Sequence, residues 1–198
     1  MTILGMSAGT RLAHAAERDK QHAFIRKLEP REHGAYRDLR LECLRLNPQL
    51  FGTTYEEAAA TTALPFERHI WKRDSDNVMF GAFIDDVLVG ICGFQRDHRE
   101  RARHRGELVH LYVVPQAAKK GIGTRLIASV MDYALIDPAV QQVTLSVSGD
   151  NDPALKIYHR AGFREYGWLE GYYHSDGENV SQLFMVYERL EVKIAHTG

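Results

Sequence analysis

The sequence lacks the features that would connect it with a membrane or a nucleic acid. Its formal net charge is only −1 across 198 residues. So small a net charge gives no electrostatic reason to expect a nucleic acid or an anionic membrane surface as a partner. No apolar run approaches the roughly 18 residues that a membrane-spanning helix needs. With 44% hydrophobic and 26% charged residues, the composition instead predicts one ordinary globular domain.

Cysteine is scarce as well, and the placement of the two cysteines indicates whether the protein resides in a reducing or an oxidising compartment. Cys43 and Cys92 lie far apart in apolar stretches, so we interpret them as reduced core residues of a cytoplasmic protein. No histidine pair has zinc-site spacing with a cysteine, which predicts that no metal is bound. Residues 1–22 lack an apolar core segment and a cleavage site, so we expect a loosely ordered extension and not a secretory signal. The folded domain is expected over residues 23–192, with a tail over 193–198.

Hydrophobic periodicity predicts a mixed α/β domain, of the α+β kind with a mixed sheet. Helices are expected over residues 31–47, 121–136 and 153–161, the last with Asp152 as its N-cap. A further helix, interrupted only at Pro65, is expected from about residue 54 to 74. Strands are expected over residues 24–28, 77–84, 87–95, 107–114, 143–148, 164–168 and 181–190. Asp85 and Asp86 mark a hairpin turn between two of these strands.

The stretch VVPQAAKKGIGTRLI, residues 113–127, joins a predicted strand to a predicted helix. The first N–H groups of a helix lack intrahelical partners and, with the helix dipole, favour an anion. Gly121 and Gly123 let a bulky diphosphate approach the backbone closely, and Lys119 and Lys120 add positive charge. The dinucleotide-binding fingerprint is excluded because Leu126 occupies its third glycine position, and the P-loop string is absent. A tight turn that happens to use glycine is the remaining alternative.

The surrounding sequence gives this loop a family context. ELVHLYVVPQAAKKGIGTRLIASVMDYA, followed by NDPALKIYHRAGF, resembles the GNAT superfamily of acetyl-CoA-dependent N-acetyltransferases. The resemblance implies a mostly antiparallel central sheet with splayed central strands and flanking helices. It also implies direct transfer of an acetyl group from acetyl-CoA to a primary amine. One departure is Ala118, where the family usually has arginine or glutamine, so some diphosphate contact is expected to shift to the two lysines.

The resemblance also implies which residues hold acetyl-CoA. The pantetheine arm would lie along the central strand, the diphosphate would lie over the glycine loop, and two side chains of the next helix would complete the site. These residues are Leu111, Tyr112, Val113, Lys119, Lys120, Gly121, Ile122, Gly123, Thr124, Asn151 and Tyr158.

The chemistry requires a neutral amine. At pH 7 a lysine amine with a pKa of about 10.4 is neutral in roughly 0.04% of molecules, and an α-amine in roughly 10–15%. Glu107, fourteen residues before Gly121, is the candidate general base, because lysine-acetylating family members carry a glutamate there. Tyr158 is the candidate acid for the leaving thiolate. The base position of the protein N-terminal acetyltransferases is occupied here by Ser146. Serine is a poor base, which argues against that subgroup or for an acceptor amine that needs less help. His110 is a weaker candidate because strand parity places it on the face opposite Glu107.

Three further segments have competing interpretations. FGTTYEE, residues 51–57, and GWLEGYYHSDG, residues 167–177, are expected as loops that either wall the acceptor site or simply pack against the domain. The arginine-rich stretch 96–105 is expected to be a solvated hairpin loop, with an anion-binding patch as the alternative. Trp71 is expected in the core.

The sequence leaves the acceptor open between a small-molecule amine and a protein amine. The alternative function is a catalytically degenerate acyl-CoA-binding regulatory protein. Ala118 and Ser146 are compatible with this alternative, because each departs from the residue type that family members carry at that position. A dinucleotide-dependent oxidoreductase would need the third glycine that is missing. The family resemblance also allows a homodimer, because an edge strand, which the last strand is expected to be, often pairs between subunits in this family.

Overall fold

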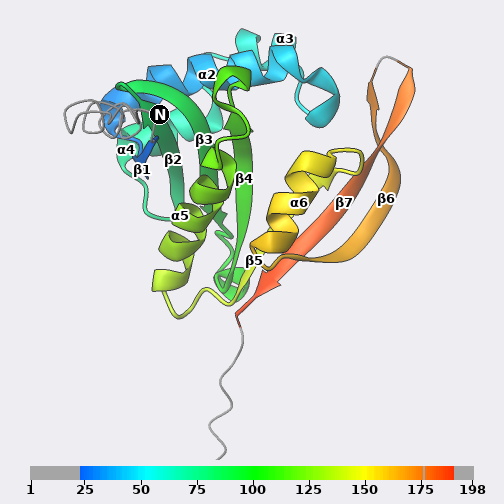
Figure 1. Cartoon of the computed structure of the whole chain (residues 1–198). Coiled ribbons are helices and arrows are strands. Elements are labelled where there is room, and N and C mark those ends of the chain that lie inside the picture. The colour runs from blue at the N-terminus through cyan, green and yellow to red at the C-terminus, as the bar shows by residue number, and fades with distance from the viewer. Residues whose placement is uncertain (1–22, 176, 190–198) are drawn as a thin grey trace, which may run out of the picture.

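The computed structural model describes residues 23–175 and 177–189. The expected extension 1–22 and tail 193–198 lie outside the described residues. The sheet has seven strands in the order β1-β2-β3-β4-β5-β7-β6 (Figure 1). The strands are β1 (Phe24–Lys27), β2 (Asn77–Ile84), β3 (Val87–Arg96), β4 (Arg105–Val113), β5 (Gln142–Ser148), β6 (Arg164–Ser175) and β7 (Glu178–Glu188).

The sheet is antiparallel except where β4 meets β5. These two central strands run parallel and pair at only three positions, from Arg105↔Gln142 to Glu107↔Thr144. Beyond that point they separate, which confirms the mostly antiparallel sheet with splayed central strands. The last strand is not an edge strand, contrary to expectation. β7 lies between β5 and β6 because the chain returns through the β6–β7 hairpin, and β6 forms the edge.

Helices cover the two faces of the sheet and divide the core into two clusters. Tyr36, Leu39 and Phe66 belong to the cluster under α2 and α4. Leu126, Ile127 and Tyr158 belong to the larger cluster under α5 and α6 on the opposite face. The helices are α2 (His33–Leu46), α3 (Tyr55–Ala60), α4 (Pro65–Lys72), α5 (Ile122–Ile136) and α6 (Asp152–Arg160). Among the described residues, no helix is both long and apolar enough to span a membrane.

The helix expected from about residue 54 to 74 is two helices. Thr54 caps α3 by accepting a hydrogen bond from the Glu57 amide, at 3.1 Å. Leu64 then adopts an extended conformation, with φ −68° and ψ 152°. The ring of the following proline disfavours the helical conformation at this position, so Pro65 starts a new helix. Trp71 on α4 is 65% exposed, so its expected place in the core is wrong.

Within the stretch 167–177, residues 167–175 are strand and not a loop, because β6 continues to Ser175 and pairs with β7 almost to the tip of the hairpin. The pairing is irregular between Leu169 and Tyr173. This irregularity explains why no clean alternation marked the strand in the sequence.

The arginine-rich stretch joins β3 to β4 as the expected hairpin loop. Two of its arginines tie the loop to the domain, since Arg96 lies 2.7 Å from Asp137 and Arg103 lies 2.9 Å from Asp76. A third, Arg99, pairs with Asp97 inside the loop. These paired charges favour the structural interpretation over an anion-binding patch.

Candidate active site

A cleft of about 860 Å³ opens where β4 and β5 separate. It collects residues from the β4 strand, the start of α5, the α6 helix and the β6–β7 hairpin. Ten of the sequence-predicted acetyl-CoA and catalytic residues line it, together with Tyr158. These ten are Glu107, Leu111, Tyr112, Val113, Lys119, Gly121, Ile122, Gly123, Thr124 and Asn151. Lys120 is exposed and does not line the cleft.

A β-bulge shapes the part of β4 that faces the cleft. Val109 pairs with Gly93 and Tyr112 pairs with Ile91, so His110 and Leu111 together oppose a single residue of β3. His110 takes the left-handed conformation, with φ 57°. The bulge resets the alternation of side chains, and the His110 Nδ1 atom therefore lies 3.1 Å from the Tyr36 hydroxyl, on the α2 face. Strand parity predicted that His110 lies on the sheet face opposite Glu107. This prediction is wrong, because the bulge turns His110 to the α2 face.

His110 is poorly suited to be a base. Burial and the nearby positive charge of Arg40 lower its pKa to about 3, so the imidazole is neutral at physiological pH and binds a proton weakly. Its contacts with Tyr36 and Phe66 give it a structural place between α2 and α4.

The bulge and the splay together leave part of the β4 backbone facing the cleft. Pairing with β5 stops at Glu107, so the edge of β4 at Leu111–Val113 has no neighbouring strand on that side. Such an edge accepts an extended ligand as an added strand. The amides of a pantetheine arm have the donors and acceptors that this edge requires.

The start of α5 has the geometry of an anion site. Gly121 is the N-cap with φ 73°, and no side chain caps this end of the helix. The Arg125 amide donates to the Gly121 carbonyl at 3.1 Å, so the preceding amides of the first turn have no intrahelical acceptor. A Cβ atom added to Gly121 would meet no atom within 4 Å. The space before this helix is thus open, and it fits a diphosphate.

The α6 helix presents two further side chains to the cleft. Asn151 is its N-cap and accepts a hydrogen bond from the Ala154 amide at 3.3 Å, whereas the sequence pointed to Asp152 as the cap. The Tyr158 hydroxyl has no hydrogen-bond partner among the described residues. Burial and the neighbouring Cys92 thiol raise the pKa of Tyr158, so the phenol keeps its proton at neutral pH and can donate it.

Glu107 lies at the point where β4 and β5 part, and its carboxyl group has no ion-pair partner among residues 23–175 and 177–189. Burial against the cleft walls raises its pKa. The hydroxyl of Tyr173 on the hairpin lies close enough that the charge of Glu107 contributes to raising the pKa of Tyr173. A carboxylate with a raised pKa holds a proton more strongly, which suits a general base near neutral pH.

Replacing Glu107 with glutamine is expected to raise thermal stability at pH 8 and to leave it unchanged near pH 3. The folded-state pKa lies above the unfolded value, so ionised Glu107 destabilises the fold once pH rises through that pKa. Melting curves at both pH values measure the effect. A variant that melts lower at pH 8 would contradict this account of the carboxyl group.

The same variant is expected to lose activity most at low pH, where neutral amine is scarcest and a base matters most. The measurement is kcat/KM between pH 6 and 9 for both proteins. An unchanged pH profile would remove Glu107 from the role of base.

Two segments expected near the acceptor meet across the cleft. Phe51, Gly52 and Thr53 line one wall, and Tyr173 of β6 lines the other. The contact is close, because a Cβ atom on Gly52 would lie 2.2 Å from the Tyr173 ring. Any larger residue would require the Tyr173 ring to move, so this loop and the β6–β7 hairpin enclose one end of the cleft.

Two polar residues of the cleft escaped the sequence analysis. Gln182 on β7 is 4% exposed, lines the cleft, and its Oε1 atom is buried with no hydrogen-bond partner. Arg40 on α2 is 7% exposed and also lines the cleft. Each interrupts an otherwise apolar face of its element, and this interruption is the only signal that the sequence offered.

Comparisons with known proteins agree with this geometry. The sequence profile of the acetyltransferase (GNAT) family matches residues 35–163. An N-alpha-acetyltransferase of Saccharolobus solfataricus is 32% identical over 108 residues, which are 51% of this chain and 64% of that protein. The N-alpha-acetyltransferase RimI of Mycobacterium tuberculosis is 34% identical over 104 residues, 52% of this chain and 63% of that one. The chain spans about a third to two thirds of the length of the curated relatives it matches.

A solved structure has the same fold. YncA of Salmonella typhimurium, a putative acetyltransferase solved with its cofactor acetyl-CoA, superposes with a TM-score of 0.71 at 16% identity. The superposition covers 84% of this chain and 93% of that one.

Proposed function

The chain belongs to the acetyltransferase (GNAT) family, and we propose that it transfers the acetyl group of acetyl-CoA to the α-amine of a polypeptide N-terminus. The observation that carries the proposal is the convergence, in one cleft, of an open β4 edge, an uncapped α5 N-terminus, Glu107 and Tyr158. The N-alpha-acetyltransferases among the relatives support the choice of acceptor. Ser146 is a departure from the protein N-terminal acetyltransferases, which carry a base at that position, but an α-amine needs little help with deprotonation and the proposal requires no second base.

Each group in the cleft has one task in this proposal. Acetyl-CoA supplies an acyl group activated as a thioester. The α5 amides and Lys119 would hold its diphosphate, and the β4 edge at Leu111–Val113 would hold its pantetheine arm. Glu107 accepts a proton from the acceptor amine, directly or through water, and Tyr158 gives a proton to the departing sulfur.

The test is a free-thiol release assay with two matched peptides and acetyl-CoA. One peptide has a free α-amine and no lysine, and the other has a blocked N-terminus and one lysine. We expect thiol release with the first peptide only. Release with the lysine peptide alone would overturn the choice of acceptor, and release with neither peptide nor a panel of small amines would favour the acyl-CoA-binding regulator.

The compartment and the assembly are secondary parts of the proposal. Cys43 and Cys92 are both buried and free, which supports a reducing compartment such as the cytoplasm. A homodimer would use the β6 edge, because β7 is enclosed.

A further inference from the structure

Arg40 is a buried charge at the end of the cleft where Phe51 lies. It projects from α2, on the face of the sheet opposite the α5 helix that begins with the phosphate loop. Its guanidinium group lies over the Phe51 ring, 4.5 Å from the centroid. Its one hydrogen bond within the described residues goes to the Cys43 sulfur, at 3.8 Å. No carboxylate of those residues lies within 4.0 Å of it.

This arrangement leaves most of the guanidinium donors without a protein partner. A guanidinium carries five N–H donors, and a thiol is a weak acceptor. A cation–π contact recovers only part of the hydration that burial removes. None of the nitrogen atoms of Arg40 is both fully shielded from solvent and without a partner, so the free donors face the cleft. Neither Glu42 nor Glu67 forms an ion pair with it: Glu42 accepts a hydrogen bond from Tyr112, and Glu67 pairs with Arg37.

We propose that Arg40 binds a carboxylate of the acceptor, so that the enzyme selects polypeptide N-termini with an acidic side chain in the first two residues. The choice of a polypeptide as the acceptor rests on the proposed function, whereas the binding of a carboxylate by Arg40 does not. Arg40, Phe51 and Glu107 line the same cleft, so an acceptor that places its amine toward Glu107 can reach the guanidinium with a nearby side chain. A planar guanidinium binds a carboxylate through two parallel hydrogen bonds. Arg40 would therefore select a carboxylate by its planar shape as well as by its charge.

The experiment compares peptide pairs that differ only in glutamate against glutamine, at the first or the second residue. Binding to the CoA-saturated protein is measured by calorimetric titration. For wild type we expect at least a tenfold tighter Kd for the glutamate peptide at one of the two positions. Arg40→Met should remove that difference, and Arg40→Lys should keep part of it as a point charge.

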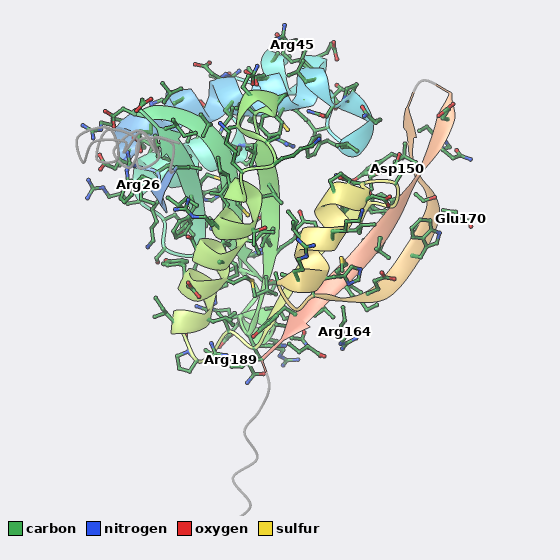
Figure 2. All side chains as sticks on the ribbon, in the orientation of Figure 1. Arg26, Arg45, Asp150, Arg164, Glu170 and Arg189 are labelled. Carbon is green, nitrogen blue, oxygen red and sulfur yellow. The ribbon has the colours of Figure 1, made fainter. Side chains whose placement is uncertain are left out.

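Arg45 supplies the matched control, because it lies on the same helix and points away from the sheet (Figure 2). Arg45→Met should keep the full preference for glutamate. Arg40→Met should melt no lower than wild type, because an apolar side chain of similar length replaces an unpaired buried charge. Its affinity for acetyl-CoA should stay within twofold of wild type.

The outcomes separate this proposal from the proposed function. Equal binding of glutamate and glutamine peptides, or a preference that survives in Arg40→Met, would overturn the role of Arg40 even if peptides are acetylated. Weaker acetyl-CoA binding in Arg40→Met would overturn it as well, by assigning Arg40 to the cofactor. If no peptide binds, titration with free glutamate decides: Arg40-dependent binding supports the anion site with a small acceptor, and no binding overturns it.

Discussion

Replacing Gly123 with glutamate is expected to weaken acetyl-CoA binding at least 100-fold. Gly123 lies in the first turn of α5, where free amides face the cleft. A carboxylate there would take the place of the diphosphate and repel its charges. An anion gains about 0.3–2 kcal/mol per charge at a helix N-terminus. At the upper end of this range, two phosphate charges account for about 4 kcal/mol, which is more than the roughly 2.8 kcal/mol that corresponds to 100-fold. Repulsion by the introduced carboxylate adds to the loss.

The fold is expected to tolerate this change, which makes the prediction specific. A Cβ atom at Gly123 would meet the Ile157 side chain at 3.4 Å, an ordinary contact. An acidic residue in the first turn of a helix is itself favourable. Calorimetric titration should therefore show lost affinity while the melting temperature stays the same or rises, and Gly123→Ala should retain binding within about tenfold. A glutamate variant that binds acetyl-CoA as wild type does would contradict the phosphate site.

Replacing Tyr158 with phenylalanine is expected to lower kcat about 100-fold, at the lower end of the range for general acid catalysis. The hydroxyl has no partner among the described residues, so its removal breaks no hydrogen bond of the fold. The ring keeps its edge contact with Phe163, at 6.0 Å between centroids. Stability and the Kd for acetyl-CoA should therefore change little. The decisive comparison is single-turnover transfer by the two proteins.

Phe163 offers a control for this comparison. Phe163→Leu disturbs the same contact but leaves the hydroxyl of Tyr158 in place. It should reduce stability, as large core substitutions do, with a smaller loss of kcat than Tyr158→Phe. Wild-type turnover in Tyr158→Phe would remove the phenol from the mechanism.

The sequence predicted those parts of the site that depend on short stretches of chain. The glycine loop and the α5 face are encoded within residues 113–136, and their spacing is set by one strand, one turn and one helix. Asn151 and Tyr158 lie on a single helix, which fixes their separation. The fold class followed because the order of elements allows few topologies.

The remaining features depend on contacts that no short stretch encodes. The bulge at His110 exists because two residues of β4 oppose one of β3, and strand parity alone cannot show this. Arg40 resembles a solvated helix residue until α2 lies against the sheet and Phe51 folds over it. For Trp71 the error was the reverse, since a residue expected in the core is exposed. An amphipathic pattern does not show how far along a helix the contact with the sheet extends.

The binding of acetyl-CoA tests the central claim most directly. Calorimetric titration of the wild-type protein with acetyl-CoA, and separately with NADH, is the measurement. We expect saturable binding of one acetyl-CoA per chain and no heat with NADH. Absence of acetyl-CoA binding would contradict the account and return the glycine pair at the start of α5 to the role of a simple turn.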